Sequence, residues 1–445
     1  MSISKPAIQR RSLRLAILNR HFWPIANSSE MEVTWLQTAL VDEGHDVDVI
    51  TIRWQKYWPE KFVFRGSQIY RLAKPLSGPF GKYRFNKALS AHLMEKQYDA
   101  MIAFGLGDDA CTAALGFGSS IPVVLRVTAA AIDELRSFGK READALMAAV
   151  RILVDNESTK TAILNRVSEV EGKVIVASSC IDLDLDMAAD LAEGRTVEPF
   201  RSLARQSGSR TALSDAHPIL QIEPHQPLVV TCMSMINDLG VCDLVKAWKM
   251  IQRRHCMARL WIIGEGKGAK NVWDEILEQD LVYTAIMPGF FDQMSEILQA
   301  ADLYIHPTRT GLDCCLLEAA RAHGVCTIST ATHDRLIEVA QNGRRAPGDK
   351  GSDKGGNTNE SATDMPFVHC YENGLLVPRH SPETLAESIL YALGDGDFRF
   401  RVGNQSRKKF AERLASGALV EPYLEAVEPR RLLAAAEKKT IEASS

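Results

Sequence analysis

The chain has 445 residues, of which 46% are hydrophobic and 24% are charged, and its formal net charge is −4. That length exceeds what one hydrophobic core supports, so two or three domains are expected. The composition is that of a globular protein and excludes disorder over most of the chain. Basic residues form no long run, which argues against a nucleic-acid partner. No apolar stretch reaches the roughly 18 residues that a membrane-spanning helix needs.

Residues 1–12 form a basic tail that contains Lys5, Arg10 and Arg11. The apolar run after it, Leu15–Leu18, is shorter than the roughly 7–15 residues of a secretory signal. We expect a frayed tail, and the alternative is a weak peripheral contact with the anionic inner face of a membrane. The nine cysteines include no C-x-x-C pair. This favours reduced thiols in a cytoplasmic protein, with neither a disulfide framework nor a zinc site.

Strand and helix patterns alternate through residues 13–185. The pattern begins with a strand at Leu13–Leu18, a helix at Glu30–Glu43 and a strand at Asp46–Thr51, and Gly44 ends the helix. Further strands are predicted at Ala100–Phe104, Val123–Val127, Ile152–Asp155 and Lys173–Ala177. Such alternation predicts a Rossmann-like domain, in which helices cover both faces of a parallel sheet.

A second α/β series occupies residues 228–395, after a polar stretch at 186–227 that we interpret as an interdomain connection, helical in part. Its predicted strands are Leu228–Cys232, Arg259–Ile263, Thr284–Met287, Leu303–His306 and Val325–Ser329. Its predicted helices are Val241–Arg253, Asn271–Gln279, Asp292–Ala300 and Leu316–Ala322. The predicted fold class is therefore α/β, with two doubly wound domains and a ligand between them, outside the carboxyl ends of the strands.

Two segments depart from this alternation. Residues 344–370 interrupt the second domain and are rich in Gly, Asn, Asp and Ser. Such a composition buries too little apolar surface to offset chain entropy, so we predict a disordered low-complexity insertion, with a ligand-gating lid as the alternative. Residues 396–445 are predicted to form C-terminal helices that pack back across the cleft.

Two local features suggest a site in the second domain. The run Gly264-Glu-Gly-Lys-Gly268 follows a predicted strand and precedes a predicted helix. Backbone N–H groups of such a turn can approach a phosphate, although a plain tight turn fits the same residues. Glu318 lies at the start of an apolar helix, where a carboxylate is either a partner of the helix dipole or a group that binds a ligand.

The segment 307–325, PTRTGLDCCLLEAARAHGV, resembles the nucleotide-sugar site of the family 4 glycosyltransferases, which have the two-domain GT-B fold. Further matches lie in the family's order around it: Gly264-Glu-Gly266, Pro288-Gly-Phe290, Ala300-Ala-Asp302, Ile337-Glu-Val339, Asn373-Gly-Leu-Leu-Val-Pro378 and Pro382-Glu-Thr-Leu-Ala-Glu-Ser-Ile389. The resemblance covers nearly the whole chain and is specific over 228–395. Gly44-His-Asp-Val47 and Val176–Asp182 match more loosely.

The resemblance implies which residues form the site. The donor is expected to contact Gly264, Gly266, Lys267, Thr310, Glu318 and Glu338. Glu318, through the ribose hydroxyls, and Arg309 are the expected catalytic residues. The acceptor side is expected at Trp23, Asn27 and Ser28, although Trp23 could equally pack against the opposite domain. Retention of anomeric configuration, with neither a metal nor another cofactor, also follows from the family.

The sequence departs from the family where catalysis depends on charge. The family has an arginine and a lysine that neutralise the departing diphosphate, and these positions are Ser234 and Leu239 here. A donor-contacting glutamate is replaced by Thr310, and a glycine pair by Asn27-Ser28. The loss of one stabilising donor typically lowers the rate by about 10²–10³. Arg309, Lys267 and Lys270 are candidates to replace the missing charge.

Metal ligands are weakly indicated. The D-x-D spacing within Asp182–Asp186 is the one that metal-dependent sugar transferases use, but it falls where the first domain is expected to end. His306, His323 and His333 lack the spacing of a metal site, and structural histidines are the simpler interpretation.

These observations predict a hexosyltransferase that moves a hexose from a nucleoside-diphosphate sugar to a glycan or lipid-linked acceptor, as in polysaccharide biosynthesis. The alternative is a catalytically inactive protein of the same fold that acts as a binding or scaffold module. Ser234, Leu239 and Thr310 are the residues that keep this alternative open.

Overall fold

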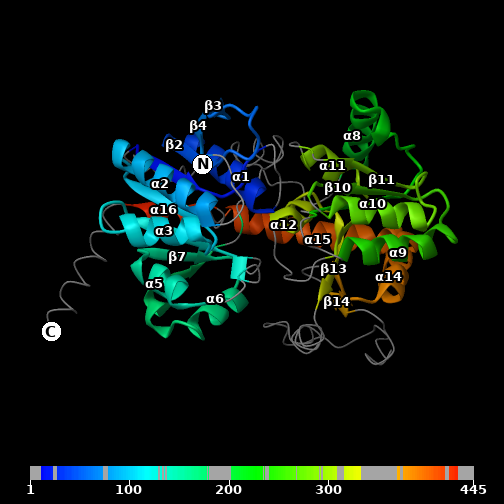
Figure 1. The fold of residues 1–445 in the computed structure, drawn as a ribbon. Coiled ribbons are helices and arrows are strands. Elements are labelled where there is room, and N and C mark those ends of the chain that lie inside the picture. Colours follow the sequence, from blue (N-terminus) through cyan, green and yellow to red (C-terminus); the bar gives the residue numbers. More distant parts are fainter. Residues whose placement is uncertain are drawn as a thin grey trace, which may run out of the picture. The chain divides into compact units, whose positions relative to one another are not determined.

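The parallel-sheet pattern occurs twice in the structure, a computed structural model of the chain (Figure 1). The structure describes residues 12–23, 28–73, 79–128, 131–132, 135, 138–177, 179, 202–233, 235, 240–266, 268–289, 291, 294–307, 315–331, 368–370, 374–415 and 420–428. The chain divides into two compact units. Unit 1 comprises Met1–Trp23, Glu32–Cys180 and Ala418–Ser445, and unit 2 comprises Pro24–Met31 and Ile181–Gly417.

Unit 1 contains an eight-stranded sheet in the order β3-β4-β2-β1-β5-β6-β7-β8. The strands are β1 (Arg14–Leu18), β2 (Asp46–Ile52), β3 (Lys61–Phe64), β4 (Ser67–Leu72), β5 (Ala100–Phe104), β6 (Val123–Val127), β7 (Arg151–Val154) and β8 (Val174–Val176). All neighbours pair in parallel except β3 and β4, which form an antiparallel hairpin at the edge. Every residue of β5 and β6 is buried, as expected for strands covered on both faces.

The helices of unit 1 follow the strands in βα alternation. They are α1 (Ser28–Asp42), which begins in the part assigned to unit 2, α2 (Pro79–Glu95), α3 (Asp108–Phe117), α5 (Lys140–Ala148), α6 (Glu157–Leu164) and the late helix α16 (Glu421–Val427), with a 3₁₀ turn η1 (Ser168–Lys173). One core joins apolar side chains of α2, α3 and α5 to one face of the sheet, through residues such as Leu89, Ala113 and Leu146.

Unit 2 contains a seven-stranded sheet in the order β11-β10-β9-β12-β13-β15-β14. The strands are β9 (Leu228–Cys232), β10 (Arg259–Ile263), β11 (Ala285–Gly289), β12 (Leu303–His306), β13 (Cys326–Ala331), β14 (Val368–Cys370) and β15 (Gly374–Pro378). Only β14, paired with β15, is antiparallel among these described strands. The carboxyl ends of the other strands therefore meet at one edge.

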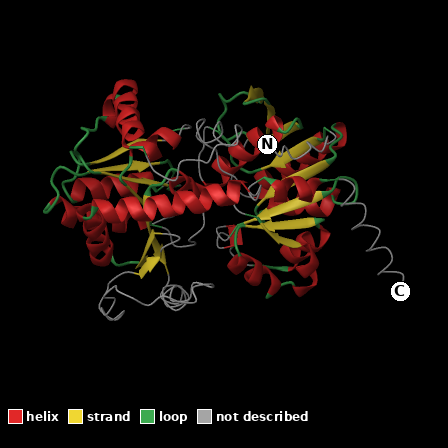
Figure 2. Cartoon of the chain, turned by 180° about the vertical axis from the view of Figure 1, so that it is seen from behind, coloured by secondary structure: helices red, strands yellow, loops and turns green. Residues whose placement is uncertain are grey.

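The helices of unit 2 are α8 (Leu203–Ala216), α9 (Gly240–Gln252), α10 (Ala269–Glu278), α11 (Met294–Ala300), α12 (Cys315–Ala322), α14 (Pro382–Gly394) and α15 (Gly396–Ala415), with a 3₁₀ turn η2 (Pro218–Leu220). Figure 2 shows helices flanking the strands of each sheet. Trp248 of α9, Ile276 of α10 and Ile389 of α14 belong to one buried core with the sheet.

The predicted α/β class with two Rossmann-like domains is confirmed, and β9, β10 and β12 have the predicted bounds. The β3–β4 hairpin was not predicted from the sequence. The stretch 186–227 contains the 14-residue helix α8, which packs against α11 in unit 2. Arg210 fixes it there, because its Nη2 lies 2.7 Å from Asp302 Oδ2 and its Nε donates to the carbonyl of Ala300 at 3.0 Å.

The last segments also differ in detail from the expectation. Val368–Cys370, the final three residues of 344–370, form β14 and belong to the sheet. The rest of that interval lies outside the described residues. Of the helices after residue 395, α15 belongs to unit 2 and α16 to unit 1. No helix among the described residues combines the length and apolar character needed to cross a bilayer.

Candidate functional site

The carboxyl edge of the unit 2 sheet holds three of the residues that the sequence singled out, Gly264, Gly266 and Glu318. Strand order reverses between β9 and β12, and ligands of open α/β sheets bind outside the carboxyl ends of the strands at such a reversal. The chain leaves this edge after Cys232 in β9, Ile263 in β10 and His306 in β12.

The glycine turn lies against the exit from β9. Gly264 has φ +136° and a Cβ there would lie 2.0 Å from the carbonyl oxygen of Met233, so only glycine fits. The N–H of Gly264 donates to Gly289 at 2.9 Å, and the N–H of Met235 donates to Glu265 at 3.1 Å. The turn therefore brings its backbone against Met233 and Met235, while the N–H of Gly264 is engaged within the sheet.

Glu318 lies in the first turn of α12, and its side chain is 10% exposed. Its Oε1 is 2.5 Å from Nη1 of Arg321, one turn further along the same helix. Both side chains are almost completely buried, so the guanidinium already balances the carboxylate. A ligand hydroxyl at Glu318 would bind a carboxylate held in place by Arg321.

His306 ends β12 beside this pair. Burial, and secondly the charge of Arg321, lower the pKa of His306 to about 4. Its ring stacks on Tyr304 with 6.4 Å between centroids, and Tyr304 donates its hydroxyl to the carbonyl of Cys232 at 3.0 Å. The imidazole is therefore neutral near pH 7 and supplies no positive charge to the edge.

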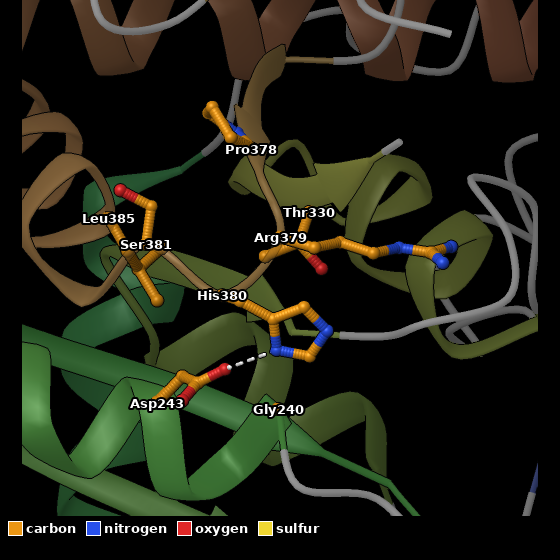
Figure 3. Close-up of a pocket in the computed structure, with 8 residues that line it drawn as sticks. All are labelled: Gly240, Asp243, Thr330, Pro378, Arg379, His380, Ser381 and Leu385. Carbon is orange, nitrogen blue, oxygen red and sulfur yellow. Dashed lines mark ion pairs between the residues drawn. The ribbon is translucent and has the colours of Figure 1, made fainter. Parts of the chain in front are cut away.

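A small pocket that is open to solvent lies at the ends of β13 and β15, against the first turn of α9 (Figure 3). It is lined by Gly240, Asp243, Thr330, Pro378, Arg379, His380, Ser381 and Leu385. Nδ1 of His380 lies 3.3 Å from Oδ2 of Asp243. Arg379 was not among the predicted site residues, although a cation directly after a strand of a parallel sheet could have been identified from the sequence.

The carboxyl edge of the unit 1 sheet has its own reversal, between β1 and β5. Trp23, after β1, stacks on Phe64 at 5.6 Å and contacts Phe62 at 6.3 Å between centroids. Its carbonyl accepts a hydrogen bond from Nη2 of Arg71 at 2.7 Å. Trp23 therefore packs on the β3–β4 hairpin of its own unit while 37% of it stays exposed.

Asp109 and His21 lie after the two strands that flank this reversal, β5 and β1, and the sequence analysis missed both. Burial raises the pKa of Asp109, opposed in part by Arg20, and burial, followed by Arg20, lowers the pKa of His21 to about 4. A Cβ at Gly107 would lie 2.7 Å from Oδ1 of Asp109. The signal was a strand followed by Gly105-Leu-Gly107 and a helix, the same pattern used at Gly264.

The structure places five of the ten predicted site residues, at least by their backbone. Gly264, Gly266 and Glu318 share the carboxyl edge of unit 2, and Trp23 lies in unit 1. Ser28 is the first residue of α1. Five predicted residues, Asn27, Lys267, Arg309, Thr310 and Glu338, lie outside the described residues, as do positions 234 and 239.

In the part of the chain that the structure describes, no group of three or more His, Cys, Asp or Glu side chains is placed to hold a metal ion. The D-x-D segment 182–186 and His333 lie outside that part. His323 is buried after the end of α12.

Comparison with known proteins gives a family match over part of the chain and a consistent fold. Residues 226–395 match the sequence model of the glycosyl transferases group 1. No curated protein sequence matches the chain. Sucrose-phosphate synthase from Thermosynechococcus elongatus superposes with a TM-score of 0.62 at 16% identity, covering 98% of this chain and 100% of that one.

Two further solved structures are similar over most of the chain. HepE of Anabaena in complex with UDP-glucose has a TM-score of 0.60 at 12% identity, with 93% of this chain and 99% of that one covered. WaaG, a glycosyltransferase involved in lipopolysaccharide biosynthesis, has a TM-score of 0.59 at 14% identity, with 90% and 98% covered. The chain thus has the GT-B fold of these glycosyltransferases, and its residues 226–395 match the glycosyl transferases group 1.

Proposed function

We propose that the protein transfers a hexose from a nucleoside-diphosphate sugar to a glycan or lipid-linked acceptor, with retention of anomeric configuration. The observation that carries the proposal is the carboxyl edge of unit 2. There the glycine turn at Gly264 and the first turn of α12 with Glu318 lie within the segment that matches the glycosyl transferases group 1.

Ligands in similar structures support the donor class. HepE is described in complex with UDP-glucose, and starch synthase IV of Arabidopsis thaliana with ADP and acarbose. The donor is proposed to contact Gly264, Gly266, Lys267, Thr310, Glu318 and Glu338. Arg309 is proposed to stabilise the departing diphosphate without a metal ion. The proposed location is the cytoplasm, and a weak peripheral contact with the membrane is the alternative.

The acceptor is proposed to bind the carboxyl edge of unit 1. The indole of Trp23 is partly exposed. Arg71 fixes the backbone of Trp23 by donating a hydrogen bond to its carbonyl. Asp109, a buried carboxyl with a raised pKa, offers a hydrogen-bonding group at the reversal between β1 and β5. Asn27 and Ser28 complete the proposed acceptor side.

The test is thermal unfolding with millimolar uridine, adenosine and guanosine diphosphates and their sugars. A ligand at a hundred times its Kd stabilises the folded state by about 2.7 kcal/mol, a shift of several degrees. Stabilisation by one base names the donor, and release of that nucleotide from its sugar in the presence of candidate acceptors demonstrates transfer. A chain that binds none of them contradicts the proposed donor.

A catalytically inactive binding or scaffold module is the second candidate. Ser234, Leu239 and Thr310 stand where the resemblance implies charged residues, and Arg321 already balances Glu318. This candidate predicts stabilisation by a nucleotide without release of product over a long incubation. Measurable turnover with any acceptor excludes it.

A further inference from the structure

Helix α2 of unit 1 presents a stripe of apolar side chains to solvent. Phe80, Tyr83 and Met94 are 76%, 65% and 81% exposed, whereas Phe85 and Leu89 are buried in the core. Spacings of three and eleven residues are close to one and three full turns, so the three exposed side chains lie on one side of the helix, along about 21 Å of its axis. A surface helix usually carries polar residues there. An exposed apolar stripe of this kind indicates an interaction surface.

The same side of α2 is positively charged. Arg84 follows Phe80 by four residues and Lys87 follows Tyr83 by four, so each base lies one turn after an exposed ring. Both bases are exposed, and neither has an ion-pair partner within the described part of the chain. The single acid in the sequence of α2 is its last residue, Glu95. The positive charge beside the stripe is therefore available to a partner.

Strand β3 extends this surface beyond α2, which packs against β4 (Figure 1). Tyr70 of β4 contacts His92 of α2 with 4.5 Å between ring centroids, so Tyr70 lies on the face of the sheet that α2 covers. Lys61 of β3 pairs with Tyr70, and Nζ of Lys61 and of Lys96 lie 5.3 Å and 5.7 Å from the centre of that ring. Val63, two residues after Lys61 and thus on the same face, is 70% exposed. Basic and apolar side chains of both elements therefore share one side of unit 1.

Helix α10 of unit 2 shows what distinguishes α2. It also exposes apolar side chains, Trp273 at 42% and Leu277 at 51%. However, Asp274 and Glu278 are exposed beside them, and Lys270, the single base of α10, lies 2.6 Å from Asp274 in an ion pair. Exposed apolar area thus occurs on both helices, whereas only α2 of the two combines it with positive charge that is not in an ion pair.

A bilayer with anionic headgroups matches this combination. Aromatic and apolar side chains enter the boundary between headgroups and acyl chains, and Lys and Arg are attracted by the negative surface potential of anionic lipids. The outer side of a helix is a convex ridge. A flat, deformable partner can contact such a ridge along its whole length, whereas a folded protein would need a matching acidic groove.

We propose that unit 1 docks on an anionic bilayer through α2, with Phe80, Tyr83 and Met94 entering the interface and Arg84 and Lys87 contacting lipid phosphates. The docking goes beyond the proposed function, because it needs no nucleotide. It locates a membrane contact on α2 instead of on the basic tail at residues 1–12.

Vesicle flotation of the full chain near pH 7 tests the docking. One set of vesicles contains phosphatidylcholine and phosphatidylglycerol in equal parts, and the other contains phosphatidylcholine alone. The wild type is expected to bind the anionic vesicles at low salt, to bind the neutral ones about tenfold more weakly, and to lose binding at high salt. Two double variants, Phe80→Ser with Tyr83→Ser and Arg84→Gln with Lys87→Gln, should each weaken binding to the anionic vesicles about tenfold or more.

Two further variants locate the effect. Trp273→Ser with Leu277→Ser is the matched control, because it removes exposed apolar area from the acidic helix α10, and it should bind as the wild type does. Arg10→Gln with Arg11→Gln removes charge from the tail and should also retain binding. Thermal unfolding checks that each variant folds. If the serine variant of α2 does not fold, Met94→Ser at the other end of the stripe replaces it, with a several-fold loss expected.

The outcomes separate this inference from its alternatives. A wild type that does not bind anionic vesicles overturns it, as do α2 variants that bind like the wild type, or a loss confined to the tail variant. Light scattering without lipid tests a second copy as the partner: a wild-type dimer that the α2 variants dissociate, with vesicle binding unchanged, also overturns the inference. Nucleotides should stabilise the α2 variants as they do the wild type. A chain that binds vesicles through α2 but binds no nucleotide supports the docking and contradicts the proposed function alone.

Discussion

Gly264 determines, as a single residue, the backbone shape at the carboxyl edge of the unit 2 sheet. Alanine at 264 would place a Cβ 2.0 Å from the Met233 carbonyl and adopt φ +136°. We expect Gly264→Ala to lower the free energy of unfolding by about 1–3 kcal/mol or more and to abolish stabilisation by nucleotides. Gly208→Ala is the control with the opposite sign, because it has open space within α8 and should stabilise by about 0.5–1 kcal/mol. Urea denaturation measures both, and equal stabilities would contradict the assignment.

His306 makes stability depend on pH. Its pKa is about 4 in the folded protein, against 6.5 for an ordinary histidine. Between these values the unfolded chain binds a proton that the folded chain does not. The free energy of unfolding therefore falls on acidification, by up to about 1.4 kcal/mol per pH unit from this group.

His306→Gln should flatten that dependence between pH 7 and 5 in urea denaturation curves, since the variant has no imidazole to protonate. His225→Gln removes an exposed histidine of the same unit and should leave the slope as in the wild type. An unchanged slope in His306→Gln would assign the pH dependence to other groups.

Individual site residues were only partly predictable. Glu318 was identified by its place in an apolar helix, yet its partner Arg321 was not, although the i,i+3 spacing of opposite charges is readable from a sequence. Arg379 and Asp109 were missed because each follows a strand whose neighbours in the sheet are set by long-range pairing. Their closeness to Gly240 and to β1 emerges only from the topology.

Helix α16 is joined to unit 1 through buried polar contacts. The Tyr423 hydroxyl donates to Oε1 of Glu32 at 2.5 Å, and the same oxygen accepts from Nε of the buried Arg126 at 2.9 Å. Arg126 also donates to the carbonyl of Ala177 at 2.8 Å. The helix thus completes the hydrogen bonding of a charged pair that water does not reach.

Tyr423→Phe is expected to cost about 1–3 kcal/mol, because the buried carboxylate of Glu32 loses a donor. Tyr283→Phe, at a side chain that is 85% exposed, should change stability by less than about 0.5 kcal/mol. Thermal or urea unfolding gives both values. A Tyr423→Phe variant as stable as the Tyr283→Phe control would show that α16 is held by apolar packing alone.

Elements covered on both faces were the predictable ones. β9, β10 and β12 are continuous apolar runs, so their bounds follow from composition. β3 alternates exposed and half-buried residues at a sheet edge, and its four residues give too weak a signal to identify. The sequence of α8 is polar, and its place in unit 2 depends on the Arg210–Asp302 ion pair, which no periodicity reveals.

At the scale of the whole molecule, the division into two units and the proposed function together predict that a bound nucleotide protects backbone amides of unit 2. Hydrogen exchange with and without the stabilising nucleoside diphosphate should show added protection at the exits of β9, β10 and β15 in unit 2. The β3–β4 hairpin of unit 1 serves as the internal reference and should exchange at the same rate in both samples. Protection confined to unit 1 would place the nucleotide in the wrong unit for the proposed function.

The division into two α/β domains was predictable from the repeated alternation of strands and helices, whereas the path of the chain between the units was not. Residues 186–227 appear polar in sequence and yet supply a helix to unit 2. Composition describes each segment alone, while membership in a unit depends on which distant side chains pair.

Because α16 follows Ile181–Gly417 of unit 2 in the chain, unit 1 is complete only after that part of unit 2 has been synthesised. A nascent chain that has completed β8 still lacks the tyrosine that covers Arg126 and Glu32, so its first unit waits for translation of the second. A chimera of two related proteins with a single crossover near residue 180 would take α16 from the other protein and so divide unit 1. A chimera that moves unit 1 together with residues 24–31 needs two crossovers, one near residue 180 and one near 418.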